Sequence, residues 1–159
     1  SAGWYIRAAK SSCGYGVLVV DYPPEKCAAF AARLHAVELD PIFLLAPTST
    51  EQRIRDVGRI ASGYVYYVSL KGVTGAGHLD TAAVAEAVPR IKAQVKVPVG
   101  VGFGIRDAAT AEAVARIADA VVVGSRIVNE IETSPEGEVI NRVRTLVQDL
   151  RRGVDAASK

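Results

Sequence analysis

Short, almost uninterrupted apolar runs recur along this chain and predict five β-strands. They cover residues 16–21, 41–46, 64–69, 97–103 and 119–124. A strand with one exposed face alternates apolar and polar residues, whereas a continuous apolar run is typical of a parallel strand that is buried on both faces. The pattern therefore predicts a parallel sheet.

Segments with a helical spacing of apolar residues separate these runs. They predict helices over residues 4–12, 25–38, 51–61, 81–95 and 108–118, and two more after the last strand, over 125–132 and 136–157. Pro89 is expected to interrupt and kink the helix 81–95, because proline lacks a backbone N–H. Strand starts recur every 22 to 33 residues. This repetition of one βα unit predicts an α/β architecture with right-handed crossovers.

Composition narrows the class of protein. Half of the 159 residues are apolar, which suits one hydrophobic core, so we expect a single domain over residues 1–159. The 19 basic and 17 acidic residues are intermixed, which argues against nucleic-acid and membrane surfaces as partners. No apolar run is long enough to span a membrane, and a cytoplasmic location is expected. Cys13 and Cys27 lack metal-ligand spacing, so no metal site is expected.

Three glycines close the fourth apolar run, in the sequence VGVGFGIRD over residues 99–107. A dinucleotide fingerprint requires a third glycine where this chain has Ile105, and an acidic residue at the end of the next strand, which is absent. A phosphate-binding P-loop is also excluded for residues 71–80, because no Gly-Lys-Ser/Thr follows the required spacing.

Two glycine-containing loops instead suggest a cup for a single phosphate group. Gly102-Phe103-Gly104 and Gly124-Ser125 each end a predicted strand and precede a helix. Glycine allows close approach of the backbone, and a helix N-terminus carries positive potential. Loops that follow consecutive late strands of a (β/α)8 barrel commonly form such a site. The alternative, that the glycines serve only tight turns, stays open.

The glycine-rich segment after the third predicted strand is a candidate flap. Thr74 and Gly75 would lie near a ligand if the segment covers the site, whereas the alternative is a plain surface loop. Side chains alternate along a strand, so Tyr66 shares a face with Tyr64. If that face is the barrel interior, the Tyr66 hydroxyl lies near the mouth.

Several of these segments, in this order and spacing, resemble the later βα units of tryptophan synthase alpha subunits. The segments are GVLVVDYPPEK (16–26), DPIFLLAPTST (40–50), GYVYYVSLKGVTGAG (63–77), PVGVGFGIRD (98–107) and ADAVVVGSRIV (118–128). The resemblance covers nearly all of residues 4–150. It implies a parallel (β/α)8 TIM-barrel type of α/β fold, of which this chain would form about five of the eight units as the C-terminal part.

The resemblance also implies an activity. The family cleaves indole-3-glycerol phosphate to indole and glyceraldehyde 3-phosphate, and passes indole to a beta subunit that carries pyridoxal phosphate; the alpha subunit itself has no cofactor. Loops after Asp21 and after Ala46-Pro47-Thr48 would face the beta subunit. The implied substrate-binding residues are Gly75, Gly104, Gly124 and Ser125 at the phosphate, Gly102 and Phe103 lining the same pocket, and Thr74 and Tyr66 beside the glycerol and indole parts.

The family's two catalytic carboxylates have no counterpart in this sequence. They lie on its second and third βα units, whereas this chain begins just before what resembles the fourth strand, so no residue here is expected to be catalytic. Because residue 1 is Ser and no Met occurs, we expect a trimmed portion of a longer protein. Pairing with the missing N-terminal portion and self-association that covers the sheet edges are the alternatives. Alternatives are another phosphate-binding barrel, such as a sugar-phosphate isomerase or epimerase, and a non-catalytic phosphate-binding module.

Overall fold

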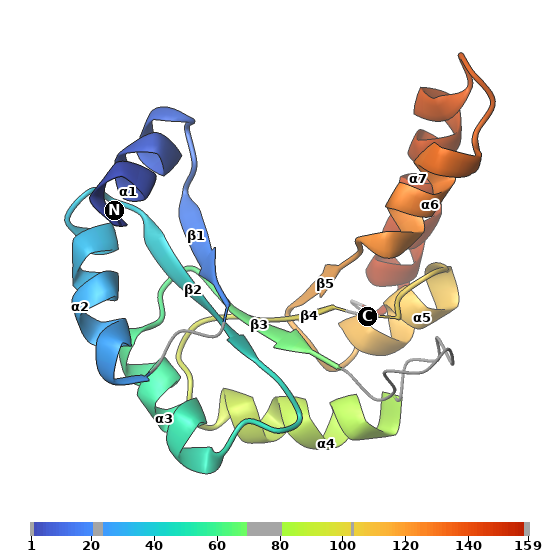
Figure 1. The fold of residues 1–159 in the computed structure, drawn as a ribbon. Coiled ribbons are helices and arrows are strands. Elements are labelled where there is room, and N and C mark those ends of the chain that lie inside the picture. Colours follow the sequence, from blue (N-terminus) through green and yellow to red (C-terminus); the bar gives the residue numbers. More distant parts are fainter. Residues whose placement is uncertain (1, 21–23, 70–80, 103, 158–159) are drawn as a thin grey trace.

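Five parallel strands form one sheet in the computed structural model, which describes residues 2–20, 24–69, 81–102 and 104–157 (Figure 1). The strands lie in the order in which they occur in the chain, and every neighbouring pair is parallel. They are β1 (Gly16–Val19), β2 (Asp40–Leu45), β3 (Val65–Val68), β4 (Val99–Gly102) and β5 (Ala120–Val122). The predicted number of strands and their parallel arrangement are confirmed.

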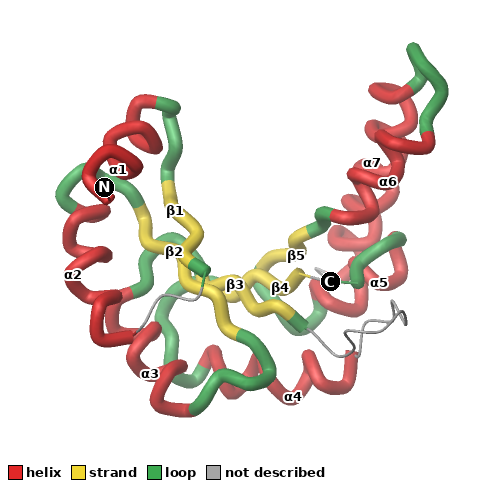
Figure 2. Tube along the Cα trace, in the orientation of Figure 1, coloured by secondary structure: helices red, strands yellow, loops and turns green. Residues whose placement is uncertain are grey.

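Helices alternate with these strands and cover one side of the sheet. They are α1 (Ala2–Ser11), α2 (Pro24–His35), α3 (Glu51–Ile60), α4 (Thr81–Lys92), α5 (Ala108–Ala115), α6 (Ser125–Thr133) and α7 (Val139–Ala157). Figure 2 shows the sheet curving, with α2 to α5 along its convex side and no helix of the described residues on its concave side. This is the arrangement of part of a (β/α)8 barrel, as predicted. None of the helices in the described ranges has the length and apolar character of a membrane span.

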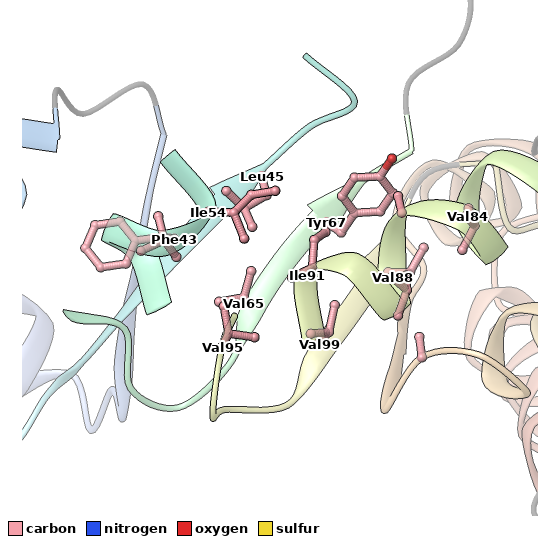
Figure 3. Packing of buried hydrophobic residues seen from close by; sticks show 14 of the residues in the cluster. Phe43, Leu45, Ile54, Val65, Tyr67, Val84, Val88, Ile91, Val95 and Val99 are labelled. Carbon is pink, nitrogen blue, oxygen red and sulfur yellow. The ribbon is translucent and has the colours of Figure 1, made fainter. Parts of the chain in front are cut away.

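The hydrophobic core lies between the convex face of the sheet and its helices. Phe43 and Leu45 alternate with partly exposed neighbours along β2 and are themselves fully buried. The strand register places Phe43 beside Val65, and Val65 beside Val99, so these side chains share the convex face. Figure 3 shows helix residues such as Ile54 packed with these strands. Burial on this face explains the apolar runs.

The concave face of the sheet is partly exposed at β1, whereas the sequence predicts that both faces are buried. Leu18 of β1 pairs with Ile42 and is 44% exposed. Val20, which follows β1, is 58% exposed. The apolar run therefore reports the burial of one face within the described residues, and leaves apolar side chains open on the other.

Pro89 lies inside α4 and does not interrupt it, so the predicted interruption was wrong. The helix continues to Lys92, and the N–H of Ala93 still donates to the Pro89 carbonyl. Val84 and Val88 on the same helix are fully buried. Their packing against the sheet offsets the local cost of proline, which is about 3 kcal/mol in an isolated helix.

Gly153 allows α7 to pack closely on α5. A Cβ atom at this position would lie 2.2 Å from the carbonyl oxygen of Ala108, the first residue of α5. Leu150, one turn earlier on α7, is buried in the core. The absence of a side chain at Gly153 thus sets the distance between these two helices.

We predict that Gly153→Ala destabilises the chain by about 1–3 kcal/mol, because the added methyl group overlaps backbone atoms that cannot move aside. Urea denaturation measures the free energy of unfolding. Gly3→Ala is the matched control, since a Cβ at Gly3 meets only the ends of arginine side chains. Equal stability of Gly153→Ala and the unsubstituted chain would contradict the close packing.

Candidate functional site

The loops that follow β4 and β5 lie side by side at the C-terminal ends of the strands, which form one edge of the sheet. All strands are parallel, so all of their C-terminal ends lie along this edge, and Gly102 at the end of β4 pairs with Val122 at the end of β5. The loop that contains Gly104 and the loop that contains Gly124 and Ser125 therefore follow neighbouring strand ends, which is the arrangement that the phosphate-cup hypothesis requires. Tyr66 lies on the adjacent strand, opposite Gly100.

Two tyrosine side chains from the β3 segment lie over the two glycines of β4. A Cβ atom at Gly102 would lie 2.2 Å from the Tyr66 hydroxyl oxygen and 2.7 Å from its ring carbons. A Cβ at Gly100 would lie 3.4 Å from the ring of Tyr64. Gly102 is thus required by the packing of Tyr66, a steric reason that the phosphate-cup hypothesis did not contain. The matching Tyr-x-Tyr and Gly-x-Gly patterns on neighbouring strands were the available sequence signal.

Burial raises the pKa of the Tyr66 hydroxyl, and the nearby Tyr64 raises it further. Tyr66 is therefore a neutral phenol near neutral pH, where its hydroxyl can donate or accept a hydrogen bond. A neutral group is compatible with an anionic ligand nearby, whereas a phenolate would repel it.

The loop after β4 ends in a helix whose N-terminus is already capped. Gly104 has a φ of +77°, a conformation that favours glycine. The Asp107 carboxylate accepts a hydrogen bond of 2.8 Å from the N–H of Thr110, and the Thr110 hydroxyl completes a capping box. The hydrogen bond from the Thr110 backbone lowers the pKa of Asp107. The N-terminus of α5 therefore carries its own anion.

The loop after β5 ends in a helix whose N-terminus is open. Gly124 is the N-cap of α6 and provides no side-chain hydrogen bond. A Cβ at Gly124 would meet no atom within 4 Å. The first hydrogen bonds of the helix come from the N–H groups of Ile127 and Val128 to the Gly124 carbonyl, so the N–H groups of Ser125 and Arg126 precede them. Exposed N–H groups at a helix N-terminus are suited to binding an anion.

Three of the predicted site residues are not placed. Thr74 and Gly75 of the candidate flap, and Phe103 of the glycine loop, lie outside the described residues, as does Asp21. The loop after β2 is described at the same edge of the sheet. There the N–H of Ala46 donates to the Ser49 hydroxyl over 2.9 Å, and the N–H of Ser49 donates to the Ala46 carbonyl.

Polar residues at the opposite edge of the sheet hold the strands together. The Asp119 carboxylate accepts hydrogen bonds from the Lys92 ammonium, at 2.7 Å, and from the N–H of Val99, at 2.8 Å. Although burial acts to raise it, these hydrogen bonds keep the pKa of Asp119 below its ordinary value. The Ser62 hydroxyl donates to Asp40 over 2.6 Å. These contacts hold the fold together, and they were not predicted from the sequence.

An ion cluster on α6 was also missed. Glu130 contacts Arg126 one turn earlier and Arg142 on α7. The hydrogen bond from Arg126 is the main reason why the pKa of Glu130 is lowered, and it outweighs the opposing effect of burial. The i,i+4 spacing of Arg126 and Glu130 was a sequence signal, but nothing local pointed to Arg142. Among the described residues, no three His, Cys, Asp or Glu side chains are grouped so as to hold a metal ion.

Comparison with known protein sequences identifies relatives over almost the whole chain. The sequence profile of the family described as "Tryptophan synthase alpha chain" matches residues 2–155. The tryptophan synthase alpha chain of Methylibium petroleiphilum is 64% identical over 155 residues, covering 98% of this chain and 57% of the relative. That of Thiobacillus denitrificans is 63% identical, with the same shares covered. The chain thus spans somewhat more than half the length of these relatives.

Solved structures agree in fold. Tryptophan synthase subunit alpha from Legionella pneumophila superposes with a TM-score of 0.83 at 29% identity, covering 98% of this chain and 58% of that one. A chain of tryptophan synthase from M. tuberculosis, crystallised in an open form, gives 0.81 at 32% identity and covers 97% and 56%.

We predict that Gly102→Ala destabilises the chain and that Tyr66→Ala in the same chain relieves part of the loss, because the clash joins these two residues. Thermal unfolding of both single variants and of the double variant gives their coupling, expected at about 1 kcal/mol or more. Gly100→Ala is the control and should cost less, since its contact is longer. Additive effects of the two substitutions would contradict the packing.

Proposed function

Because this chain belongs to the tryptophan synthase alpha chain family, we propose that it forms the phosphate-binding part of a lyase subunit that cleaves indole-3-glycerol phosphate to indole and glyceraldehyde 3-phosphate. The observation that carries the proposal is the open N-terminus of α6 beside the glycine loop that follows β4. A phosphate dianion gains hydrogen bonds and favourable potential at such a position.

In this proposal the phosphate of the substrate binds to the N–H groups of Ser125 and Arg126, with the Ser125 hydroxyl as a further donor. Gly124 leaves the open space that the phosphate occupies, and the Gly104 loop borders it on the neighbouring strand. Since Asp107 already caps α5, the phosphate lies nearer to α6. Gly75 is proposed to contact the same phosphate.

The rest of the substrate is proposed to extend from the phosphate across the concave face of the sheet. Tyr66 lies on that face as a neutral hydroxyl over Gly102, next to the expected position of the glycerol and indole parts. Thr74 and Phe103 are assigned to the same pocket by family membership. The exposed apolar side chains of this face suit an indole ring.

Cleavage needs one group that protonates the indole ring carbon and one that takes the proton of the glycerol hydroxyl. Asp107 is held in its capping box and is not free for either role. We propose that the acid and the base belong to the βα units that the relatives contain and this chain does not span. The chain itself then binds and orients the phosphate end of the substrate.

The remaining properties follow from the family and are part of the proposal. The subunit uses no cofactor of its own, and a beta subunit with pyridoxal phosphate receives the indole. The loop around Ala46, Pro47 and Thr48 lies at the edge of the sheet where that partner would dock. The proposal also includes a cytoplasmic location and a single domain over residues 1–159.

We predict that Ser125→Asp weakens the binding of glycerol 3-phosphate by about tenfold or more, because a carboxylate would stand where the phosphate dianion binds. Isothermal titration calorimetry on the 159-residue chain measures the affinity. Ala93→Asp is the matched control, because it adds the same charge at an exposed position near the other edge of the sheet. Equal affinity of Ser125→Asp and the unsubstituted chain would contradict phosphate binding at the N-terminus of α6.

The 159-residue chain alone is expected to bind the phosphate ester without cleaving indole-3-glycerol phosphate, since it lacks the proposed acid and base. A discontinuous assay for released indole tests this directly. Turnover by the purified chain would refute the division of roles and would require a catalytic group within these residues. Absence of phosphate-ester binding would refute the proposed site.

A further inference from the structure

An ion cluster centred on the buried Glu130 joins the short helix α6 to the long helix α7, and its two arginine side chains are partly exposed. Glu130 of α6 is 8% exposed. Its carboxylate accepts a hydrogen bond from the Arg126 guanidinium, with Nη1 to Oε2 at 2.7 Å, and forms an ion pair with Arg142 of α7, with Nε to Oε1 at 2.9 Å. Both oxygens of the carboxylate are thus occupied, one by each helix.

The order of charges within α6 does not favour the helix itself. A basic residue near a helix N-terminus and an acidic residue one turn later oppose the helix dipole, and the reverse order is the stabilising one. Arg126 and Glu130 have the unfavourable order, whereas Glu112 and Arg116 on α5 have the favourable one. The Arg126–Glu130 pair therefore adds little to the stability of α6 itself. The contact of Glu130 that joins two helices is its ion pair with Arg142, which holds α6 on α7.

The same helix α7 also holds α5. Gly153 allows the two backbones to meet at Ala108, which is the first residue of α5 and follows the Gly104 loop. Glu130 lies one and a half turns beyond Ser125, the first residue of α6 after Gly124. Both helices that begin at the two glycine loops therefore pack on the same helix, α7.

We propose that Glu130 is a positioning residue, which fixes α6 on α7 and thereby holds the N–H groups of Ser125 and Arg126 at a set place relative to the Gly104 loop. The inference rests on the proposed function, because it assumes that these N–H groups bind the phosphate. Arg142 is the partner through which Glu130 acts. A phosphate that bridges two loops needs their spacing fixed, because displacement of about 1 Å weakens such contacts strongly.

For the substitution Glu130→Gln, charge alone and loss of position change the phosphate affinity in opposite directions. Replacing Glu130 by Gln removes a negative charge from the helix that carries the phosphate site, so Coulomb attraction alone would tighten binding of a dianion. Loss of position would weaken binding, because α6 is no longer held by Arg142. The direction of the change separates the two effects.

The experiment compares the affinity for glycerol 3-phosphate of the unsubstituted chain, Glu130→Gln and the control Asp155→Asn by calorimetry. Asp155 pairs with Arg151 on the exposed side of α7, so the control removes one negative charge without touching α6. We expect Glu130→Gln to bind about fivefold or more weakly, and Asp155→Asn to bind as the unsubstituted chain does. Amide hydrogen exchange should rise at Ser125 to Val128 and stay unchanged at Gly153.

A second pair of variants keeps the test valid if Glu130→Gln fails to fold. Arg142→Lys retains the charge that faces Glu130, whereas Arg142→Met removes it with similar length. Weaker binding by the Met variant together with faster amide exchange at Ser125 to Val128, neither of which the Lys variant shows, supports positioning through the ion pair, because loss of charge alone would leave the exchange unchanged. Equal or tighter binding by Glu130→Gln, or equal affinity of the two Arg142 variants, overturns the inference while the phosphate site stands. If the unsubstituted chain binds no phosphate ester, the proposed function and this inference both fail.

Discussion

The parallel pairing of five strands in chain order is the constraint on which the rest of the structure depends. It sends every strand's C-terminal end to one edge and every N-terminal end to the other. The glycine loops meet at the first edge, whereas hydrogen-bonded clusters such as Lys92 with Asp119 and Ser62 with Asp40 hold the second. The proposed binding site and the contacts that stabilise the sheet thus lie at opposite ends of the strands, and substitutions at the two ends are expected to have different consequences.

Three glycines near the proposed binding site are required for three different physical reasons. Gly102 leaves room for the ring of Tyr66, Gly104 adopts a positive φ, and Gly124 leaves open space in front of an uncapped helix. Only the third reason concerns a ligand directly. The first two shape the surface next to it, because a side chain at Gly102 would displace Tyr66 from the concave face.

Much of the fold could be predicted from the sequence, because apolar runs and their repeat report burial and chain order. The ends of elements and Pro89 could not, since tertiary packing of Val84 and Val88 decides whether α4 continues. The place of Ser125 was predictable from strand order. The ion pair between Glu130 and Arg142 was not, because Arg142 lies on another helix and no local pattern connects the two residues.

The asymmetry between α5, capped by Asp107, and α6, capped by no side chain, leads to the central claim that a phosphate ester binds at the α6 N-terminus. Titration of the ¹⁵N-labelled chain with glycerol 3-phosphate, followed by amide shifts, tests it most directly. The account predicts the largest shifts at Gly124, Ser125 and Arg126, with smaller ones at Gly104. A groove near the N-terminal ends of the strands is lined by Arg55, Arg59 and Lys96. Shifts confined to that groove, or no shifts at all, would contradict the claim.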